Sequence, residues 1–250
     1  MAAATDTTRT ALDNHANGRE EPNTTASSTT SSTGPKRRQI IVRQFLFIYD
    51  FWVLGIVNTF AWSCSTVRYL LPQFRANIRK NHLDVGVGTG YYLDKSQIPH
   101  TTRLTLVDIE WAALEAAKKR SRRSDANLVL ADILQPLSLK EMFDSVSMYY
   151  LLHCIPAPMR DKCSIFSHIK YNMTADGIIH GATILGKGVA DDNWFGKRIR
   201  RRCLNRGVFH NKEDNAYEFE EALRKNFKKV ETRVVGAVFI WRAEGPKLDD

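Results

Sequence analysis

The 250-residue sequence lacks several features that would place it in a special class of protein. Its four cysteines, Cys64, Cys154, Cys163 and Cys203, form no C-x-x-C pair and have no histidines at zinc-finger spacing. A disulfide-rich mini-protein is therefore excluded, and no structural metal site is expected. The chain shows no internal repeat and no apolar segment of the secretory type near its first residue. We therefore expect a globular protein of the cytoplasm.

The overall amino-acid composition is that of an ordinary globular protein. Hydrophobic residues make up 43% of the chain and charged residues 25%, which is typical of a soluble globular domain. Lys and Arg number 36 against 27 Asp and Glu, so the net charge is +9. Such an excess permits an anionic partner such as a nucleic acid, but net charge alone identifies neither a fold nor a ligand.

The N-terminal part of the chain differs from the rest. Residues 1–38 contain no aromatic residue and are crowded with Thr, Ser, Ala and Asn, which predicts a disordered tail. The apolar stretch Ile40–Trp62 is interrupted by Arg43 and Asp50, whereas a transmembrane helix needs about 20 predominantly apolar residues. We expect helices that pack over the domain, so that residues 39–80 form a helical lid with no membrane span.

Strand and helix patterns alternate in the remaining sequence, residues 81–250. The expected strands are His82–Val85, Leu104–Val107, Leu128–Ala131, one within Phe143–Leu152, Ile178–Leu185, Val230–Val235 and Val238–Arg242. The expected helices are Glu110–Arg122, Met159–Met173 and Glu218–Phe227. Alternation of this kind predicts an α/β domain with a mostly parallel sheet and helices on both faces. The last two strands predict an antiparallel hairpin at one edge.

The most informative motif is the glycine-rich segment Leu83–Gly90. Its glycines follow the pattern G-x-G-x-G at the carboxyl end of a strand, where open α/β sheets bind their ligands. Dinucleotide enzymes use G-x-G-x-x-G, with a pyrophosphate resting on a helix N-terminus. Here Asp84 precedes the glycines inside the strand, which favours a ligand that carries a cation or hydroxyl groups.

Two further acids end the next two strands. Asp108 follows the second strand, where a carboxylate can accept both hydroxyls of a ribose. Asp132 follows the third, where it could accept the amine of an adenine. Any one of these acids could serve solubility alone. Together with Asp84 and the glycine loop, they indicate a nucleoside site on one rim of the sheet.

These residues resemble a known family. The segment Asp84–Gly90, followed by Asp108 and then Asp132-Ile133, looks like the class I S-adenosylmethionine-dependent methyltransferases. The resemblance extends over about residues 45–243, and it implies a Rossmann-like sheet of seven mostly parallel strands, an antiparallel edge hairpin and an N-terminal helical cover. Tyr49–Gly55, Leu151–Pro156 and Gly181–Gly186 resemble small-molecule methyltransferases of fungal and actinobacterial natural-product metabolism.

The resemblance also implies a cofactor and its contacts. S-adenosylmethionine would be the methyl donor and S-adenosylhomocysteine the product. The glycines would pass under its methionine part, with Asp84 near the ammonium and Asp108 at the ribose, while Tyr49 would close over it. The implied cofactor-binding residues are Tyr49, Asp84, Gly86, Gly88, Thr89, Gly90, Asp108, Ile109, Asp132, Ile133 and Tyr149.

Fewer residues point to the chemistry of transfer. An electrophilic methyl group needs an aligned nucleophile, and a base only where that nucleophile must lose a proton. His153 is the best-placed base, although a histidine that binds a loop explains the position equally well. His180, inside a predicted strand, has a structural role. Trp194, in the basic segment Asp191–His210, is the expected substrate contact, while most charges of that segment form a solvated face.

Three functions remain open. The leading one is methyl transfer to an oxygen, nitrogen, sulfur or carbon atom of a small molecule, a secondary metabolite. The second is nucleic-acid methylation, which the net charge favours but which lacks the N-P-P-Y, D-P-P-Y and Pro-Cys signatures. The third is a protein that holds the cofactor while directing a cyclisation without methyl transfer.

Overall fold

The computed structural model describes residues 57–189 and 193–248. The predicted tail and the first part of the predicted lid, including Tyr49, lie outside the described residues. Among those described, no helix has both the length and the apolarity needed to cross a bilayer.

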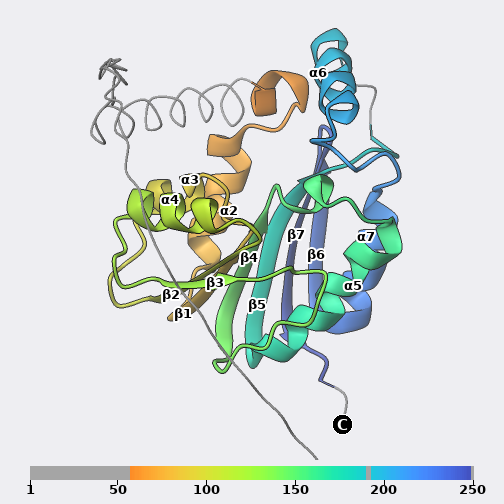
Figure 1. Ribbon diagram of the computed structural model, residues 1–250. Helices are drawn as coiled ribbons and strands as arrows, with labels where there is room; N and C mark the ends of the chain where they lie inside the picture. The colour runs from red at the N-terminus through yellow and green to blue at the C-terminus, as the bar shows by residue number, and fades with distance from the viewer. Residues whose placement is uncertain (1–56, 190–192, 249–250) are drawn as a thin grey trace, which may run out of the picture.

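Seven strands form one sheet, in the order β3-β2-β1-β4-β5-β7-β6 (Figure 1). The strands are β1 Asn81–Val85, β2 Arg103–Asp108, β3 Asn127–Leu130, β4 Phe143–Tyr149, β5 Met173–Ile184, β6 Phe227–Val235 and β7 Val238–Pro246. Strands β1 to β5 pair in parallel, while β7 runs antiparallel to both β5 and β6. The predicted α/β class is therefore confirmed, with its edge hairpin and Rossmann-like strand arrangement.

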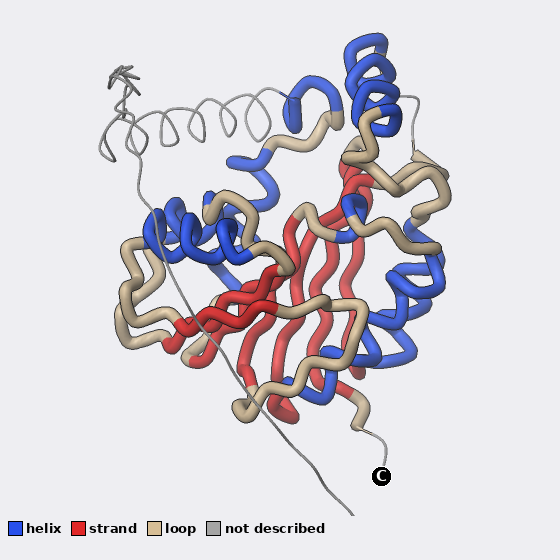
Figure 2. The backbone as a smooth tube through the Cα atoms, in the orientation of Figure 1, coloured by secondary structure: helices blue, strands red, loops and turns tan. Residues whose placement is uncertain are grey.

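Helices cover both faces of the sheet (Figures 1 and 2). The α-helices are α2 Leu71–Asn77, α3 Tyr91–Ser96, α4 Trp111–Ser121, α5 Met159–Ile169, α6 Trp194–Asn205 and α7 Ala216–Asn226. One core cluster packs α2, α3 and α4 against the sheet, around Phe74 and Leu114. A second cluster packs α5 and α7 against the other face, around Phe166 and Phe219. Parallel strands buried on both faces explain the nearly continuous apolar runs in the sequence.

The boundary between α5 and β5 differs from the prediction. The helix ends at Ile169, a 3-10 turn (η4) spans Lys170–Asn172, and β5 begins at Met173. Asp176 and Gly177, just before the predicted start of the strand at Ile178, therefore lie within β5, at an irregularity where the pairing with β4 shifts from Met173 to Ile178. The sequence did not indicate a strand here because Ala175 and Asp176 are exposed, which interrupts the apolar pattern.

A segment before α2 lies over the carboxyl edge of the sheet. It contains a π-helical turn over residues 57–61 and a second one, η2 Thr66–Leu70. The carbonyl oxygen of Trp62 accepts a hydrogen bond from the Ala237 backbone N–H in the β6–β7 hairpin, at 2.9 Å. This contact fixes the last part of the predicted lid against the sheet edge.

Candidate functional site

The glycine loop leaves β1 with three residues in the left-handed region. Gly86, Gly88 and Gly90 have φ values of 70°, 49° and 70°. At Gly90 a Cβ atom would lie 2.7 Å from Cα of Ala117 in α4, so the loop must be glycine for α4 to pack there. At Gly88 nothing lies within 4 Å of such a Cβ. The loop is therefore closed on its α4 side and open at Gly88.

Asp108 ends β2 with its carboxylate turned toward this loop. Its Oδ1 accepts a hydrogen bond from the Glu110 backbone N–H at 3.0 Å, and its Oδ2 lies 3.4 Å from the Gly88 backbone nitrogen. The side chain is half-buried. Each carboxylate oxygen has lone-pair capacity left, so Asp108 can accept two further hydrogen bonds beside the loop.

Asp84 is buried in β1 directly before the loop. Its Oδ1 accepts a hydrogen bond from the Ser147 hydroxyl of β4. Burial raises the pKa of this carboxyl to about 7, against the lowering effect of the Ser147 hydrogen bond. Within the described ranges, no Lys, Arg or His nitrogen forms an ion pair with it. The site therefore holds a buried acid that a cationic ligand group would complement.

The predicted adenine contacts are less uniform. Asp132 is exposed, and its Oδ1 accepts a hydrogen bond from the Leu134 backbone N–H at 2.9 Å. Ile109 exposes 66% of its surface beside Asp108, whereas Ile133 exposes only 6% and packs in the core under α5 and α7. Ile109 thus offers an apolar surface to a ligand and Ile133 offers little.

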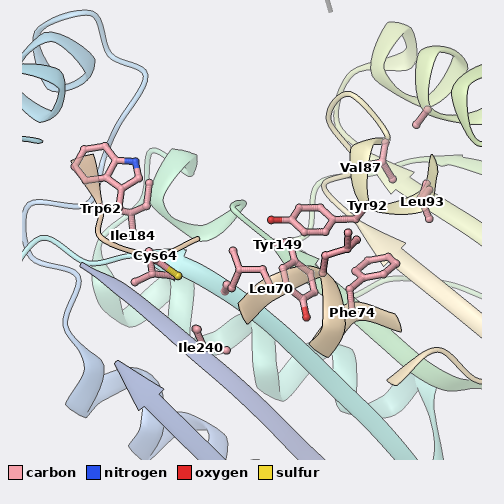
Figure 3. Packing of buried hydrophobic residues seen from close by; sticks show 14 of the residues in the cluster. Trp62, Cys64, Leu70, Phe74, Val87, Tyr92, Leu93, Tyr149, Ile184 and Ile240 are labelled. Carbon is pink, nitrogen blue, oxygen red and sulfur yellow. The ribbon is translucent and has the colours of Figure 1, made fainter. Parts of the chain in front are cut away.

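Thr89 and Tyr149 make internal contacts. The Thr89 carbonyl oxygen accepts a hydrogen bond from Arg120 at 3.3 Å, which ties the loop to α4. Tyr149 is buried against Tyr92, with ring centroids 4.7 Å apart (Figure 3). Its hydroxyl lies 3.0 Å from Nδ1 of His180. In the structure Tyr149 therefore fills the core beneath the rim, and His180 is its structural partner.

The neighbouring Tyr150 has two features that the sequence did not reveal. Its φ of 57° is unusual for a residue other than glycine, and such backbone strain occurs mainly at functional sites. Its hydroxyl is buried beside the Asn58 side chain, and the nearby hydroxyl of Tyr92 is buried without a hydrogen-bond partner among the described residues. Burial raises the pKa of both hydroxyls well above the ordinary value. Both are therefore neutral groups able to donate a hydrogen bond to a ligand.

His153 lies in the short 3-10 turn η3, Leu152–Cys154, after β4. Its backbone N–H donates to the Thr183 hydroxyl oxygen at 3.1 Å, and its Nδ1 lies 3.3 Å from the same oxygen. The ring packs edge-on against Phe209 and Tyr150, with centroids 4.8 and 5.7 Å apart. Burial lowers the pKa of His153 to about 3, and Lys162 and Arg200 act in the same direction. The imidazole is therefore neutral at pH 7.

The helix α6 places Trp194 and the arginines differently. Trp194 exposes 78% of its surface and stacks on Phe195, with centroids 6.3 Å apart. Arg200 is half-buried: it donates a hydrogen bond to the Leu185 carbonyl oxygen at 2.6 Å, and its guanidinium lies 5.1 Å from the Trp62 ring centroid. Of these residues, Arg200 is the one that contacts the carboxyl end of β5.

A buried ion pair fixes the loop after α6. Lys162 of α5 is fully buried, and its Nζ donates to both carboxylate oxygens of Asp214 at 2.8 and 2.9 Å. It also donates to the His210 carbonyl oxygen at 2.9 Å. The loop therefore cannot shift without exposing or breaking a desolvated charge pair. No sequence pattern marks the two residues, which are 52 positions apart.

Comparison with known proteins identifies the family. A family model described as a methyltransferase domain matches residues 83–171, which include the glycine loop and all three rim acids. The chain is 56% identical over 223 residues to the O-methyltransferase adaD of Aspergillus niger, covering 85% of this chain and 90% of that protein. The chain belongs to the methyltransferase family. This methyltransferase is also 65% identical over 189 residues to the N-methyltransferase vrtF of Penicillium aethiopicum, covering 76% of this chain and 79% of vrtF.

Solved structures agree on the fold. The N-methyltransferase NodS of Bradyrhizobium japonicum WM9, in complex with S-adenosyl-l-homocysteine, aligns with a TM-score of 0.52 at 18% identity. The match covers 71% of this methyltransferase and 84% of NodS. The prediction of a methyltransferase of natural-product metabolism is confirmed, and these relatives favour neither nucleic-acid methylation nor a cyclisation without methyl transfer.

Proposed function

We propose that this methyltransferase transfers a methyl group from S-adenosylmethionine to a small-molecule acceptor of secondary metabolism by in-line displacement. The observation that carries this proposal is the open glycine loop with Asp84 and Asp108 placed beside it at the ends of neighbouring strands. When bound, S-adenosylmethionine supplies a methyl group made electrophilic by its positive sulfur. The chain supplies binding, alignment and exclusion of water.

The residues present fit this cofactor. Asp84 is a buried carboxylate with no cation beside it among the described residues, and the ammonium of the methionine part supplies the missing charge. Asp108 keeps acceptor capacity on both oxygens, which suits the two hydroxyls of a ribose. The open side of Gly88 lets the ligand approach the backbone.

The other expected contacts follow the resemblance. Asp132 accepts a hydrogen bond from the adenine amine, and the exposed Ile109 covers one face of the base. The remaining residues do not touch the cofactor directly but pack beneath the residues that do: Ile133, Thr89 and Tyr149. Tyr49, with the rest of the lid over residues 39–80, closes over the bound cofactor, while residues 81–250 form the core.

The acceptor lies beyond the ends of β4 and β5. This position is surrounded by the aromatic rings of Tyr150, His153, Trp62 and Phe209. The Tyr150 hydroxyl and the His153 imidazole are its two buried hydrogen-bonding groups. When His153 donates from Nδ1 to Thr183, its Nε2 is the atom left to accept a proton. Its low pKa makes it a weak base, which suits an acceptor whose hydroxyl is already acidic, such as a phenol.

The acceptor is a small molecule rather than a nucleic acid. The basic residues next to this position lie on α6, where Arg200 already donates a hydrogen bond to the Leu185 carbonyl oxygen after β5. Trp194, on the same helix, adds exposed apolar surface. The relatives named above carry O- and N-methyltransferase activities in their names, so oxygen and nitrogen are the acceptor atoms to test. We place the protein in the cytoplasm, where its four cysteines remain thiols.

Calorimetric titration with S-adenosylmethionine and with S-adenosylhomocysteine tests the proposal. We expect one site with a dissociation constant in the micromolar range for both ligands, since both carry the amino-acid and ribose groups that the rim receives. Adenine alone is the control and should bind far more weakly. Absence of heat with both ligands would overturn the proposed cofactor site.

A further inference from the structure

A line of buried polar side chains runs beneath the glycine loop. His82 and Asp84 lie two positions apart on one face of β1, directly opposite Ser145 and Ser147 on β4. His82, Ser145 and Ser147 are fully buried, and Asp84 exposes 6% of its surface. Four polar side chains at such positions are costly unless all are hydrogen-bonded.

These side chains are joined into one chain of hydrogen bonds. The Arg79 backbone N–H donates to the Ser145 hydroxyl oxygen at 2.9 Å, and that oxygen lies 2.7 Å from Nδ1 of His82. Nε2 of His82 lies 3.0 Å from the Ser147 hydroxyl oxygen, and the Ser147 hydroxyl donates to Asp84. The chain thus links the amino end of β1 to the acid at its carboxyl end.

The two ends fix the direction of every hydrogen bond. A backbone N–H can only donate and an ionised carboxylate can only accept. Because Ser147 gives its single proton to Asp84, its oxygen must accept from His82, which places the histidine proton on Nε2. Nδ1 then accepts from the Ser145 hydroxyl, whose oxygen accepts from the backbone. Burial lowers the pKa of His82 to about 3, which agrees with this neutral tautomer.

We propose that His82 is a positioning residue for cofactor binding, which acts through Ser147 to hold the Asp84 carboxylate ionised and aimed at the cofactor's amino group. This inference rests on the proposed function. His82 itself has no surface for a ligand, since it is fully buried. Its contribution is to polarise Ser147, because hydrogen bonds in a chain strengthen one another.

Other groups around Asp84 cannot take over this role. Asp108 from β2 faces it with a like charge, which opposes ionisation. Tyr149 from β4 is neutral, and its hydroxyl is bonded to His180 of β5. His180 stacks on His82, with ring centroids 6.1 Å apart, but makes no hydrogen bond with the chain of polar groups. The Ser147 hydroxyl is therefore the described group that favours the charged carboxylate.

The contrast between His82 and His180 provides a matched pair of variants. His82→Phe keeps a ring against Phe74 and His180 but cannot donate to Ser147. His180→Phe removes an equally buried imidazole that lies outside the chain of polar groups. His82→Gln retains one donor and one acceptor and is the conservative variant expected to restore part of the effect.

The experiment is calorimetric titration of the full chain between pH 6 and 8.5 with two probes. S-adenosylhomocysteine carries the amino-acid group, and 5′-methylthioadenosine lacks it. For His82→Phe we expect about fivefold weaker binding of S-adenosylhomocysteine at pH 7, which is the loss of ionised Asp84 that a one-unit rise of its pKa from about 7 produces. The pH of half-maximal affinity should rise by about one unit, since Asp84 becomes harder to ionise. His180→Phe should leave this pH unchanged, and His82→Gln should give an intermediate shift.

The outcomes separate this inference from the proposed function. Equal losses for both probes, or no change in either the affinity or the pH of half-maximal affinity, would overturn the role of His82. Failure of the wild-type chain to bind S-adenosylhomocysteine would instead overturn the cofactor site itself. Should His82→Phe not fold, Ser145→Ala removes the hydroxyl that donates to Nδ1 of His82 but leaves the hydrogen bond from Ser147 to Asp84 in place, and the same two results decide.

Discussion

The two halves of the sheet's carboxyl edge are built in different ways. The half proposed for the cofactor comes from one stretch of sequence, from Asp84 to Asp132, and consists of backbone turns and carboxylates. The half proposed for the acceptor brings together Trp62, Tyr150 and Phe209, which lie far apart in the chain. A constant ligand can be bound by a local motif, whereas the pocket for a variable ligand is assembled by tertiary packing.

The difference also appears in what holds each half. Loop and strand geometry hold the cofactor half, as at Gly90, where α4 packs directly on the backbone. Hydrogen bonds between distant segments hold the acceptor half: His210 donates from its backbone N–H to the His153 carbonyl oxygen, and the Asn211 amide donates to the Ile184 carbonyl oxygen, both at 2.8 Å. Changes in the two halves should therefore be separable.

The largest effect is expected where the acceptor half depends on the buried ion pair. Lys162→Met leaves the Asp214 carboxylate buried without its partner, which should lower the free energy of unfolding by about 3–5 kcal/mol. Urea denaturation followed by circular dichroism measures this change. Lys187→Met, which breaks the exposed pair with Glu213, is the control and should cost less than about 1 kcal/mol.

The next effect tests the cofactor half. Asp108→Ala removes both acceptors proposed for the ribose hydroxyls, so the affinity for S-adenosylhomocysteine should fall by about 100-fold or more. Asp132→Ala, at an exposed acid on the same rim, should reduce it less than about tenfold. Titration calorimetry of the two variants decides, and equal small losses would contradict the assignment of the ribose site.

A pair of glycine substitutions separates packing against α4 from the cost of the backbone conformation. Gly90→Ala places a methyl group against the Ala117 backbone at positive φ, and we expect a loss of about 2 kcal/mol in the free energy of unfolding. Gly88→Ala meets no atom and should cost about 1 kcal/mol for its backbone conformation alone. Similar destabilisation by the two variants would show that α4 does not constrain the loop at Gly90.

The smallest effect is a dependence on pH. Asp84 has a pKa of about 7 because it is buried, so at lower pH its carboxyl carries a proton that a bound ammonium must displace. Affinity for S-adenosylhomocysteine should therefore rise by about tenfold between pH 6 and pH 8. Asp84→Asn removes the titrating group, and its affinity should be weak and nearly constant over this range.

The sequence predicted the sheet well, because the apolar runs that form strands are local signals. Glycine spacing and strand-end acids also predicted that Asp84 and Asp108 lie beside the glycine loop, where the structure has them, while their contacts with the cofactor remain predictions. The hydrogen bonds between His82 and Ser147 have a partial signal in the sequence, because polar residues alternate along both strands. Which residues face one another depends on the register of the two strands, which the sequence does not give. The first residues of β5 were not predicted as strand because several of them are polar or exposed.

The acceptor half could not be predicted in the same way. The backbone strain of Tyr150 leaves no mark in composition, and the pairing of Lys162 with Asp214 joins positions that no periodicity relates. The size and aromatic ring of Trp194 predict a substrate contact, whereas no sequence signal marks Arg200, six positions later, as the residue that contacts the sheet. Such contacts follow from the packing of whole elements rather than from neighbouring residues.

A crystal structure of the chain with S-adenosylhomocysteine would test the division of the rim most directly. We expect the amino group at hydrogen-bond distance from Asp84, the ribose hydroxyls on Asp108, and the sulfur directed toward Tyr150 and His153. A ligand lying across the ends of β4 and β5, without contact to Asp108, would contradict it.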